Sequence, residues 1–259
     1  GGFNQWATAK ELPPHLAAIA PTAAPFMGLD WPALGGIWPS YMVQWLAFTS
    51  GKAANTNLFT DVAFWQDRFR ERYRRGLPFA ALDSVAGYPS SVYRTWMAHP
   101  DLDDYWADMS PSADQLAQLA LPVFTRTGMY DNAQIGALEH YRNHLRHGPP
   151  AARANHVLMI GPWDHGGTRT PQPTIGGLDV GTESVFDLGA LEAEWFDWTL
   201  RNGPRPKRLP VQVHPNSRRS WTGKFPQGDR LGHRGPPVGG VGGAGAGVGL
   251  RRAPSSRRR

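Results

Sequence analysis

LPVFTRTG, residues 121–128, and HVLMIG, residues 156–161, decide the fold of this 259-residue chain. Each run is short and apolar and stops at a glycine, which is typical of a strand buried on both faces of a sheet. A helical pattern follows each strand, over residues 132–147 and 188–202, and ends before a glycine. This alternation predicts parallel strands joined by right-handed crossovers, and therefore an α/β fold with a parallel sheet and flanking helices.

Asp131 and His165 stand in the loops that follow these two strands. They belong to the sequences Gly-Met-Tyr-Asp and Gly-Pro-Trp-Asp-His. Because functional groups collect beyond the carboxyl ends of parallel strands, we expect a carboxylate and an imidazole at a common edge of the sheet. Asp164 is a weaker candidate for this carboxylate, because a side chain next to the histidine in sequence ordinarily points elsewhere.

The chain opens on Gly1-Gly2, which indicates a helix over residues 2–12 entered from a tight glycine turn, and a short apolar strand is expected at residues 16–20. In α/β-hydrolases the nucleophilic serine sits on such a strand-to-helix turn, Gly-x-Ser-x-Gly, where a Cβ on the glycines would collide with a neighbouring strand. If Gly2 closes this turn, the serine belongs two residues before Gly1.

The order of nucleophile, acid and histidine along the chain is that of the α/β-hydrolases. A serine hydroxyl becomes a good nucleophile when an imidazole accepts its proton, and the imidazole needs a carboxylate on its other nitrogen. We therefore expect a partial α/β-hydrolase fold with Asp131 and His165 as catalytic residues, and with no metal and no cofactor. The chain reads as a fragment that is inactive because the serine lies upstream of Gly1.

Residues 25–120 read as a helical cap inserted into the core, with helical stretches such as residues 61–75. Asp30, beside Trp31, is the cap carboxylate that we expect to bind a substrate ammonium; a helix N-cap or turn aspartate is the alternative. Large aromatic side chains dominate burial energetics, so we expect the cap tryptophans to pack between helices rather than to form a binding platform. These are Trp31, Trp38, Trp45, Trp65, Trp96 and Trp106.

The motifs resemble those of a known family. Gly-Met-Tyr-Asp131-Asn and Ile-Gly-Pro-Trp-Asp-His165-Gly are similar to the acid and histidine signatures of the cocaine-esterase and Xaa-Pro dipeptidyl-peptidase group, the CocE/NonD hydrolases. HPDLDDYW at residues 99–106 resembles a stretch near the end of their cap, and WFDW at residues 195–198 resembles their last core helix. The similarity covers residues 1–213.

The resemblance implies a Gly-x-Ser-Tyr-x-Gly turn whose serine and tyrosine immediately precede Gly1. It also implies an oxyanion hole made by a tyrosine hydroxyl from an earlier loop and by the backbone N–H after the serine, both outside this sequence. The family ends in a jelly-roll β domain, of which residues 209–213 supply at most the first strand. Its members cleave alkyl and aryl esters, β-lactam side-chain amides or Xaa-Pro peptides, which implies a small-molecule ester, amide or peptide substrate and leaves its identity open.

The charge divides the chain into an acidic body and a basic tail. Residues 1–203 hold 14 Lys and Arg against 20 Asp and Glu, whereas residues 204–259 hold 13 against 1. From Gly228 onward the Gly/Arg-rich sequence has little to bury, so we expect disorder, and a reading frame lost between Val213 and Gly228 would explain this composition. The expected parts are the hydrolase core at 1–24, the helical cap at 25–120, the core with acid and histidine at 121–203, the start of a truncated β domain at 204–227, and the tail at 228–259.

Two other classes of function stay open. His140, His144 and His147 are spaced by four and three residues on one expected helix, which would suit a metal-dependent hydrolase. Arg142 and Arg146 would repel a cation there, so we interpret this helix face as solvated. The basic tail could bind nucleic acid through its phosphates, but it lacks the aromatic side chains that stack on bases.

The sequence says little about membrane association, cellular compartment or oligomeric state. No run of about 18 apolar residues is present, so we expect no membrane partner. The absence of cysteine excludes disulfides and thiolate metal sites but does not fix the compartment. A cytoplasmic location is favoured, with a signal peptide in a longer parent chain as the alternative, and the oligomeric state stays open.

Overall fold

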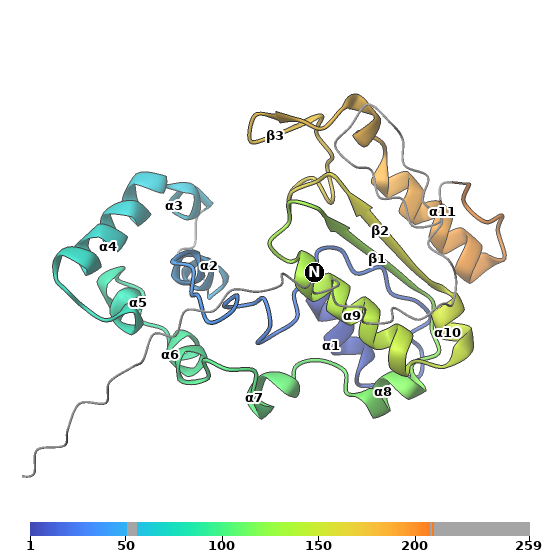
Figure 1. Ribbon diagram of the computed structural model, residues 1–259, viewed down its shortest axis with the longest axis horizontal. Helices are drawn as coiled ribbons and strands as arrows, with labels where there is room; N and C mark the ends of the chain where they lie inside the picture. The colour runs from blue at the N-terminus through green and yellow to red at the C-terminus, as the bar shows by residue number, and fades with distance from the viewer. Residues whose placement is uncertain (51–55, 208, 210–259) are drawn as a thin grey trace, which may run out of the picture. The chain divides into compact units, whose positions relative to one another are not determined.

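The computed structural model describes residues 1–50, 56–207 and 209. Strands and helices alternate from residue 123 onward, which confirms the predicted α/β class with a parallel sheet and flanking helices (Figure 1). Among the described residues, no helix has the length and apolar character needed to cross a membrane. The α-helices are α1 (Gly2–Ala9), α2 (Tyr41–Thr49), α3 (Thr56–Thr60), α4 (Val62–Arg74), α5 (Leu82–Val85), α6 (Ser91–Ala98), α7 (Asp104–Ala107), α8 (Ala113–Gln118), α9 (Gln134–His147), α10 (Pro150–Ala154) and α11 (Leu188–Arg201). The strands are β1 (Val123–Gly128), β2 (His156–Gly161), β3 (Thr174–Ile175) and β4 (Leu178–Asp179).

β1 and β2 form the parallel pair that the sequence predicts. The register runs from Val123 opposite His156 to Gly128 opposite Gly161. β1 is buried at every position, and β2 at every position but one. Because the two strands are paired over the same length, their carboxyl ends are level and the loops that follow them begin at the same edge of the sheet.

The strand predicted at residues 16–20 is not formed as such. This segment makes one isolated parallel bridge to β1, at Ile19, and a second bridge follows it at Thr22. Between them, the N–H of Ala20 donates to Oε1 of Gln5 (2.8 Å), and Nε2 of Gln5 donates back to the carbonyl of Ala20 (3.3 Å). A side-chain amide of α1 therefore satisfies the backbone groups that face away from β1.

Different helices cover the two faces of the sheet (Figure 1). On one face α11 packs against β1, with the rings of Phe124 and Trp195 5.6 Å apart. On the other face Trp6 of α1 joins a core cluster with Val123 and stacks on His140 of α9, with ring centroids 4.9 Å apart. Covering on both faces is what the continuous apolar runs of β1 and β2 require.

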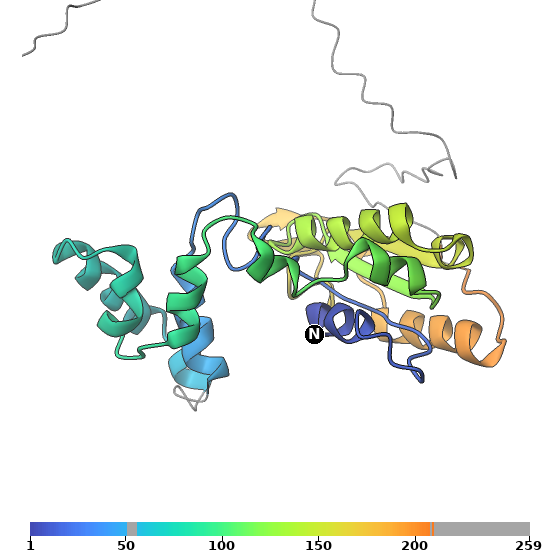
Figure 2. The same ribbon diagram turned by 90° about the horizontal axis from the view of Figure 1, so that it is seen from below.

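Residues 41–118 contain helices and no strand among their described positions (Figure 2). Their core is a cluster of aromatic and aliphatic side chains, to which Met27 and, from α1, Phe3 also contribute. Five of the six cap tryptophans pack in or against this cluster, and the sixth, Trp45, packs against Trp31, Tyr41, Phe48 and Phe59. Trp65, Trp96 and Trp106 are buried, and Trp31 and Trp38 are partly buried against them.

The predictions for the end of the chain fall mostly outside the described residues. This applies to the truncated β domain at 204–227, apart from 204–207 and 209, to the tail at 228–259, and to the lost reading frame. Leu209 is described, and it is buried in the core cluster beneath α11.

A buried cation fixes α11 to the sheet. The guanidinium of Arg126 in β1 donates to the Glu192 carboxylate of α11, to Oγ1 of Thr22 (2.9 Å) and to the carbonyl of Leu188 (3.1 Å). The side chain of Arg126 is only 6% exposed. Burial lowers the pKa of Arg126, while the charge of Glu192 raises it. The ion pair therefore keeps a cation charged beneath the helix.

Removal of the Glu192 carboxylate is expected to destabilise the fold by about 2 kcal/mol, because Glu192→Ala leaves a buried guanidinium without its counter-charge. The loss stays below that of a fully buried pair because Glu192 is itself 30% exposed. Urea unfolding followed by tryptophan fluorescence measures it. Glu194→Ala, at an exposed position of the same helix, is the matched control, and an equal loss in both variants would contradict the prediction.

Candidate active site

The backbone continues the ladder of β1 and β2 beyond the ends of the strands. The N–H of Met129 donates to the carbonyl of Gly161 (2.8 Å), and the N–H of Tyr130 donates to the carbonyl of Trp163 (3.0 Å). Gly128 allows this close approach, because a Cβ at that position would overlap the backbone of Trp163. The loops that follow the two strands therefore leave the sheet side by side.

Asp131 and His165 meet where these loops leave the sheet. Nδ1 of His165 lies 2.9 Å from Oδ1 of Asp131, which also accepts the N–H of Ala133 (3.0 Å). The Asp131 side chain has no exposed surface, whereas that of His165 is 52% exposed. Since an ionised carboxylate only accepts, Nδ1 carries the proton of the neutral ring. Nε2 has no hydrogen-bond partner among the described residues and is free to accept a proton.

Two further side chains shape the loop that carries His165. Oδ1 of Asp164 accepts the N–H of Gly167, three residues further on (2.7 Å), and Oγ1 of Thr168 donates to the carbonyl of His165 (2.8 Å). Thr168 is completely buried. The carboxylate of Asp164 thus holds its own loop together, and the carboxylate that bonds to the imidazole is that of Asp131.

A second histidine–aspartate pair lies in residues 99–106. Nδ1 of His99 is 2.6 Å from Oδ2 of Asp103, and the imidazole stacks on Tyr105 at 4.3 Å. The hydrogen bond to His99 lowers the pKa of Asp103. The two side chains are 33% and 42% exposed, so solvent screens their interaction. Because both residues belong to one short turn, we interpret this pair as a contact that shapes the turn.

Comparison with known proteins identifies the family. A family profile described as X-Pro dipeptidyl-peptidase (S15 family) matches residues 1–167, a stretch that contains both Asp131 and His165. The chain belongs to the S15 family. The resemblance carried by the acid and histidine motifs is thereby confirmed.

A solved structure shares the fold of this S15 chain. The crystal structure of an aminopeptidase from the marine sediment archaeon Thaumarchaeota archaeon matches it with a TM-score of 0.54 and 19% sequence identity. The match covers 77% of this chain and 33% of that chain, so this chain spans about a third of the length of its structural neighbour. No curated protein matches the sequence. At this identity the likeness shows the fold alone.

Asp30, one of the two predicted substrate-binding residues of the S15 chain, is buried. It is 7% exposed, and its Oδ1 accepts the N–H of Phe26 (2.8 Å) while its Oδ2 accepts the N–H of Gly136 (2.6 Å). Burial raises the pKa of the Asp30 carboxyl to about 6; these backbone hydrogen bonds lower the pKa, and the charge of Asp131 raises it. The geometry resembles the turn aspartate that the sequence leaves as the alternative, and a contact with substrate stays a prediction.

Trp31, the other predicted substrate-binding residue, is half-buried in an aromatic group. Its ring meets those of Tyr41 (6.4 Å) and Trp45 (6.3 Å) edge to face. Such contacts fix the indole in place, and its role towards a substrate also stays a prediction.

The solvated histidine face expected on α9 is wrong for two of its three residues. His140 and His144 are 2% and 0% exposed, because this side of the helix packs against α1 and the sheet. Their Nε2 atoms lie 3.1 Å from the carbonyl of Pro25 and 3.3 Å from that of Leu119. Among the described residues no group of three or more potential ligands is placed to hold a metal. Nothing in this arrangement favours the metal-dependent alternative.

A chain of buried hydrogen bonds continues from α9 into the sheet. Nδ1 of His144 lies 2.8 Å from Nδ1 of His156, whose Nε2 lies 2.8 Å from Oγ1 of Thr125. The carbonyl of Leu119 only accepts, so a neutral His144 donates from Nε2, His156 donates from Nδ1, and Thr125 donates its hydroxyl. Burial lowers the pKa of both histidines, which keeps the rings neutral. No spacing signal marks this network, since its members come from separate elements.

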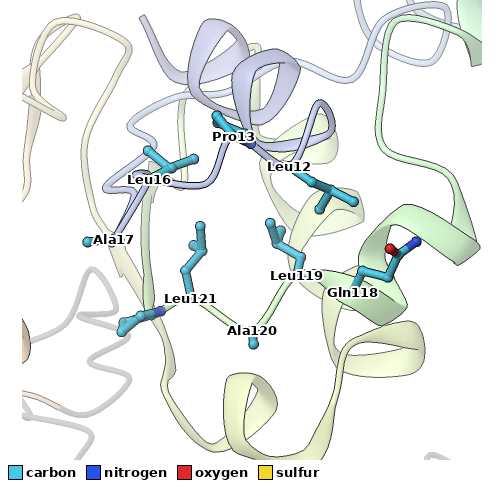
Figure 3. A pocket seen from close by; sticks show the side chains of 9 residues that line it. Leu12, Pro13, Leu16, Ala17, Gln118, Leu119, Ala120 and Leu121 are labelled. Atoms are coloured by element: carbon cyan, nitrogen blue, oxygen red, sulfur yellow. The ribbon is translucent and has the colours of Figure 1, made fainter.

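A pocket of about 360 Å³ opens near the amino end of β1 (Figure 3). Leu121 and Pro122, which lead into β1, belong to its wall, together with Leu12 and Leu16. Asp131 follows the opposite end of β1, so this pocket lies at the other end of the strand from the Asp131–His165 pair and is not part of the candidate site.

Proposed function

We propose that Asp131 and His165 are the acid and the base of a Ser-Asp-His triad in a serine hydrolase of the S15 family. One observation supports the proposal above all: a fully buried carboxylate bonds to Nδ1 of a half-exposed imidazole, on two loops beyond the level ends of parallel strands. A triad needs this arrangement, because the carboxylate fixes the tautomer that leaves Nε2 free to take a proton. We expect the serine on the turn that leads into α1.

The two side chains would act in sequence. As the serine oxygen attacks the carbonyl carbon of the substrate, Nε2 of His165 takes the hydroxyl proton, and Asp131 stabilises the imidazolium that forms. The imidazolium then gives this proton to the leaving alcohol or amine as the scissile bond breaks. A water molecule repeats both steps on the acyl-enzyme, so the acyl group passes to water.

The substrate class comes from the family. An ester, an amide or an Xaa-Pro peptide would each present the carbonyl that this chemistry requires. Because the predicted serine precedes Gly1, we expect no triad-dependent turnover from the 259 residues by themselves. Hydrolysis that His165→Ala abolishes in this chain would put the nucleophile within the sequence and contradict that placement.

Asp131→Ala tests the proposed pair directly. In the unchanged protein at pH 9, where imidazoles are neutral, nitrogen-15 chemical shifts are expected to show the proton of His165 on Nδ1. In the variant no carboxylate accepts from Nδ1, so we expect the proton to move to Nε2, the nitrogen on which a free neutral imidazole prefers to carry it. In a serine-containing hydrolase, this change of tautomer lowers kcat by ~10⁴-fold.

The second histidine–aspartate pair supplies the matched control for this test. Asp103→Ala removes the carboxylate that bonds to His99 and should leave the His165 shifts unchanged. A His165 ring that keeps its proton on Nδ1 in Asp131→Ala would show that Asp131 does not fix the tautomer, and the proposed triad would be wrong.

A further inference from the structure

The carboxylate of Asp30 joins two segments that lie far apart in the sequence. Its Oδ1 closes its own turn by accepting the N–H of Phe26 (2.8 Å). Its Oδ2 accepts the N–H of Gly136 in the first turn of α9, across 106 positions of sequence (2.6 Å). Both oxygens of a buried carboxylate are thus used to hold the turn at residues 26–30 against the start of α9.

α9 depends on this outside carboxylate for its N-terminal cap. The helix begins after Ala133, which offers no side-chain acceptor to the free N–H groups of the first turn. Asp30 takes one of them, at Gly136, and its negative charge lies at the positive end of the helix dipole. It does the work of an N-cap residue from a distant part of the chain.

The contact leaves no room for adjustment. A Cβ at Gly136 would lie 2.5 Å from Oδ1 of Asp30 and 2.6 Å from the carbonyl carbon of Pro25, so only glycine lets the turn and the helix come so close. His140, one helical turn further along α9, adds a second link through its Nε2 and the carbonyl of Pro25 (3.1 Å). Two hydrogen bonds therefore join the turn to the helix.

The same first turn of α9 fixes Asp131. The N–H of Gln134 donates to the carbonyl of Asp131 (3.2 Å), and the side-chain amide of Gln134 donates to the carbonyl of Gly128 (3.0 Å). The N–H of Ala133 binds Oδ1 of Asp131, the oxygen that faces His165. A shift of the helix start would carry the carboxylate with it.

We propose that Asp30 is a positioning residue: by capping α9 at Gly136, it holds Asp131 in the place where its carboxylate meets Nδ1 of His165. The inference rests on the proposed role of the Asp131–His165 pair. In this role Asp30 needs no contact with substrate. The turn at residues 26–30 and the catalytic acid then belong to one structural unit.

Asp30→Asn is the decisive variant. Its amide keeps one acceptor oxygen and turns an NH₂ donor toward the other backbone N–H, so one of the two hydrogen bonds is lost. In the 259-residue protein at pH 9, we expect the share of His165 with its proton on Nδ1 to fall by roughly half, measured by nitrogen-15 chemical shifts. A residue that only stabilised the fold would lower Tm and leave this share unchanged.

Asp83→Asn is the matched control. Asp83 is another buried carboxylate that accepts backbone N–H groups, from Ser84 (2.6 Å) and Ser90 (2.8 Å), but it lies in the cap, and its partners among the described residues, Arg94 included, all lie there too. We expect this variant to lower Tm while the His165 shifts stay as they are. Equal changes of the His165 shifts in both variants would overturn the inference.

A rescue variant keeps the test decisive. Ala133→Ser on the Asp30→Asn background puts a hydroxyl acceptor at the N-cap of α9 itself, three residues before Gly136, and should restore the Nδ1 tautomer. Unchanged His165 shifts in Asp30→Asn would overturn the inference while the Asp131→Ala result still decides the triad. Failure of both Asp30 variants to fold would also overturn it, since Asp30 would then support the whole fold.

Discussion

A fall in pH from 7 to 5 is expected to lower the free energy of unfolding by about 3 kcal/mol, through the buried imidazoles of α9 and β2. Burial lowers the pKa of His140 to about 4, that of His156 well below its ordinary value, and that of His144 as well. Above about pH 6.5 these histidines are neutral in both states and their contribution is fully present. Below pH 6.5 the histidines of the unfolded chain bind protons, whereas the buried rings of the folded state stay neutral. The free energy of unfolding therefore falls by about 1.4 kcal/mol per histidine and per pH unit.

Asp30 acts in the opposite direction. Its folded pKa of about 6 lies above the ordinary 3.8, so the folded state binds a proton as the pH falls through 6 while the unfolded chain does not. Protonation of Asp30 raises the free energy of unfolding by about 1 kcal/mol between pH 6 and 5. The net loss of about 3 kcal/mol already includes this gain. Asp30→Asn removes the opposing contribution and should make the acid loss steeper.

Urea unfolding at pH 7, 6 and 5 measures the effect. His140→Gln keeps an N–H donor for the carbonyl of Pro25 but cannot titrate, and we expect it to reduce the acid loss by about 2 kcal/mol. His15→Gln, at an exposed position before the sheet, should leave the loss unchanged. The same acid loss in His140→Gln and in the unchanged protein would rule out the buried imidazoles as its source.

Local sequence patterns predicted the part of the fold that local physics controls. The apolar runs that end at Gly128 and Gly161 became β1 and β2, and the helix expected at residues 188–202 is α11, Leu188–Arg201. From the two strands alone, the meeting of Asp131 and His165 follows, because level parallel strands bring their following loops together. The position of the site therefore needed no knowledge of other parts of the molecule.

Contacts between segments that are far apart in the chain could not be predicted from local sequence patterns. Helical spacing identified the histidines of α9 but not the side of the helix that faces the core, because Arg142 and Arg146 on the neighbouring side suggested solvent. The bond of Asp30 to Gly136 spans 106 positions and depends on a glycine whose helical surroundings look unremarkable in sequence. The segment at residues 16–20 looked like a strand by composition, yet Gln5 takes the outward backbone groups of Ala20.

Gly128→Ala is expected to cost about 3 kcal/mol and to separate the two loops of the candidate site. Gly128 ends β1 beside the backbone of Trp163, where an added Cβ would lie only 3.2 Å from Cβ of Trp163 and would overlap its carbonyl group. That carbonyl accepts the N–H of Tyr130, so relief of the overlap breaks the bond that ties one loop to the other. Urea unfolding measures the cost, and the nitrogen-15 shifts of His165 report the separation.

Gly166→Ala separates this steric argument from a general intolerance of the site. Gly166 follows His165 directly, but a Cβ there would meet only Oδ1 of Asp164 at 3.5 Å, an ordinary contact, and its backbone is not in the left-handed region. We expect the free energy of unfolding to change by less than about 0.5 kcal/mol and the His165 ring to keep its proton on Nδ1. The contrary result is a Gly128→Ala variant that changes the free energy of unfolding and the His165 shifts as little as Gly166→Ala does. The close approach of the two loops at Gly128 would then not be what brings Asp131 to His165, and the prediction would be wrong.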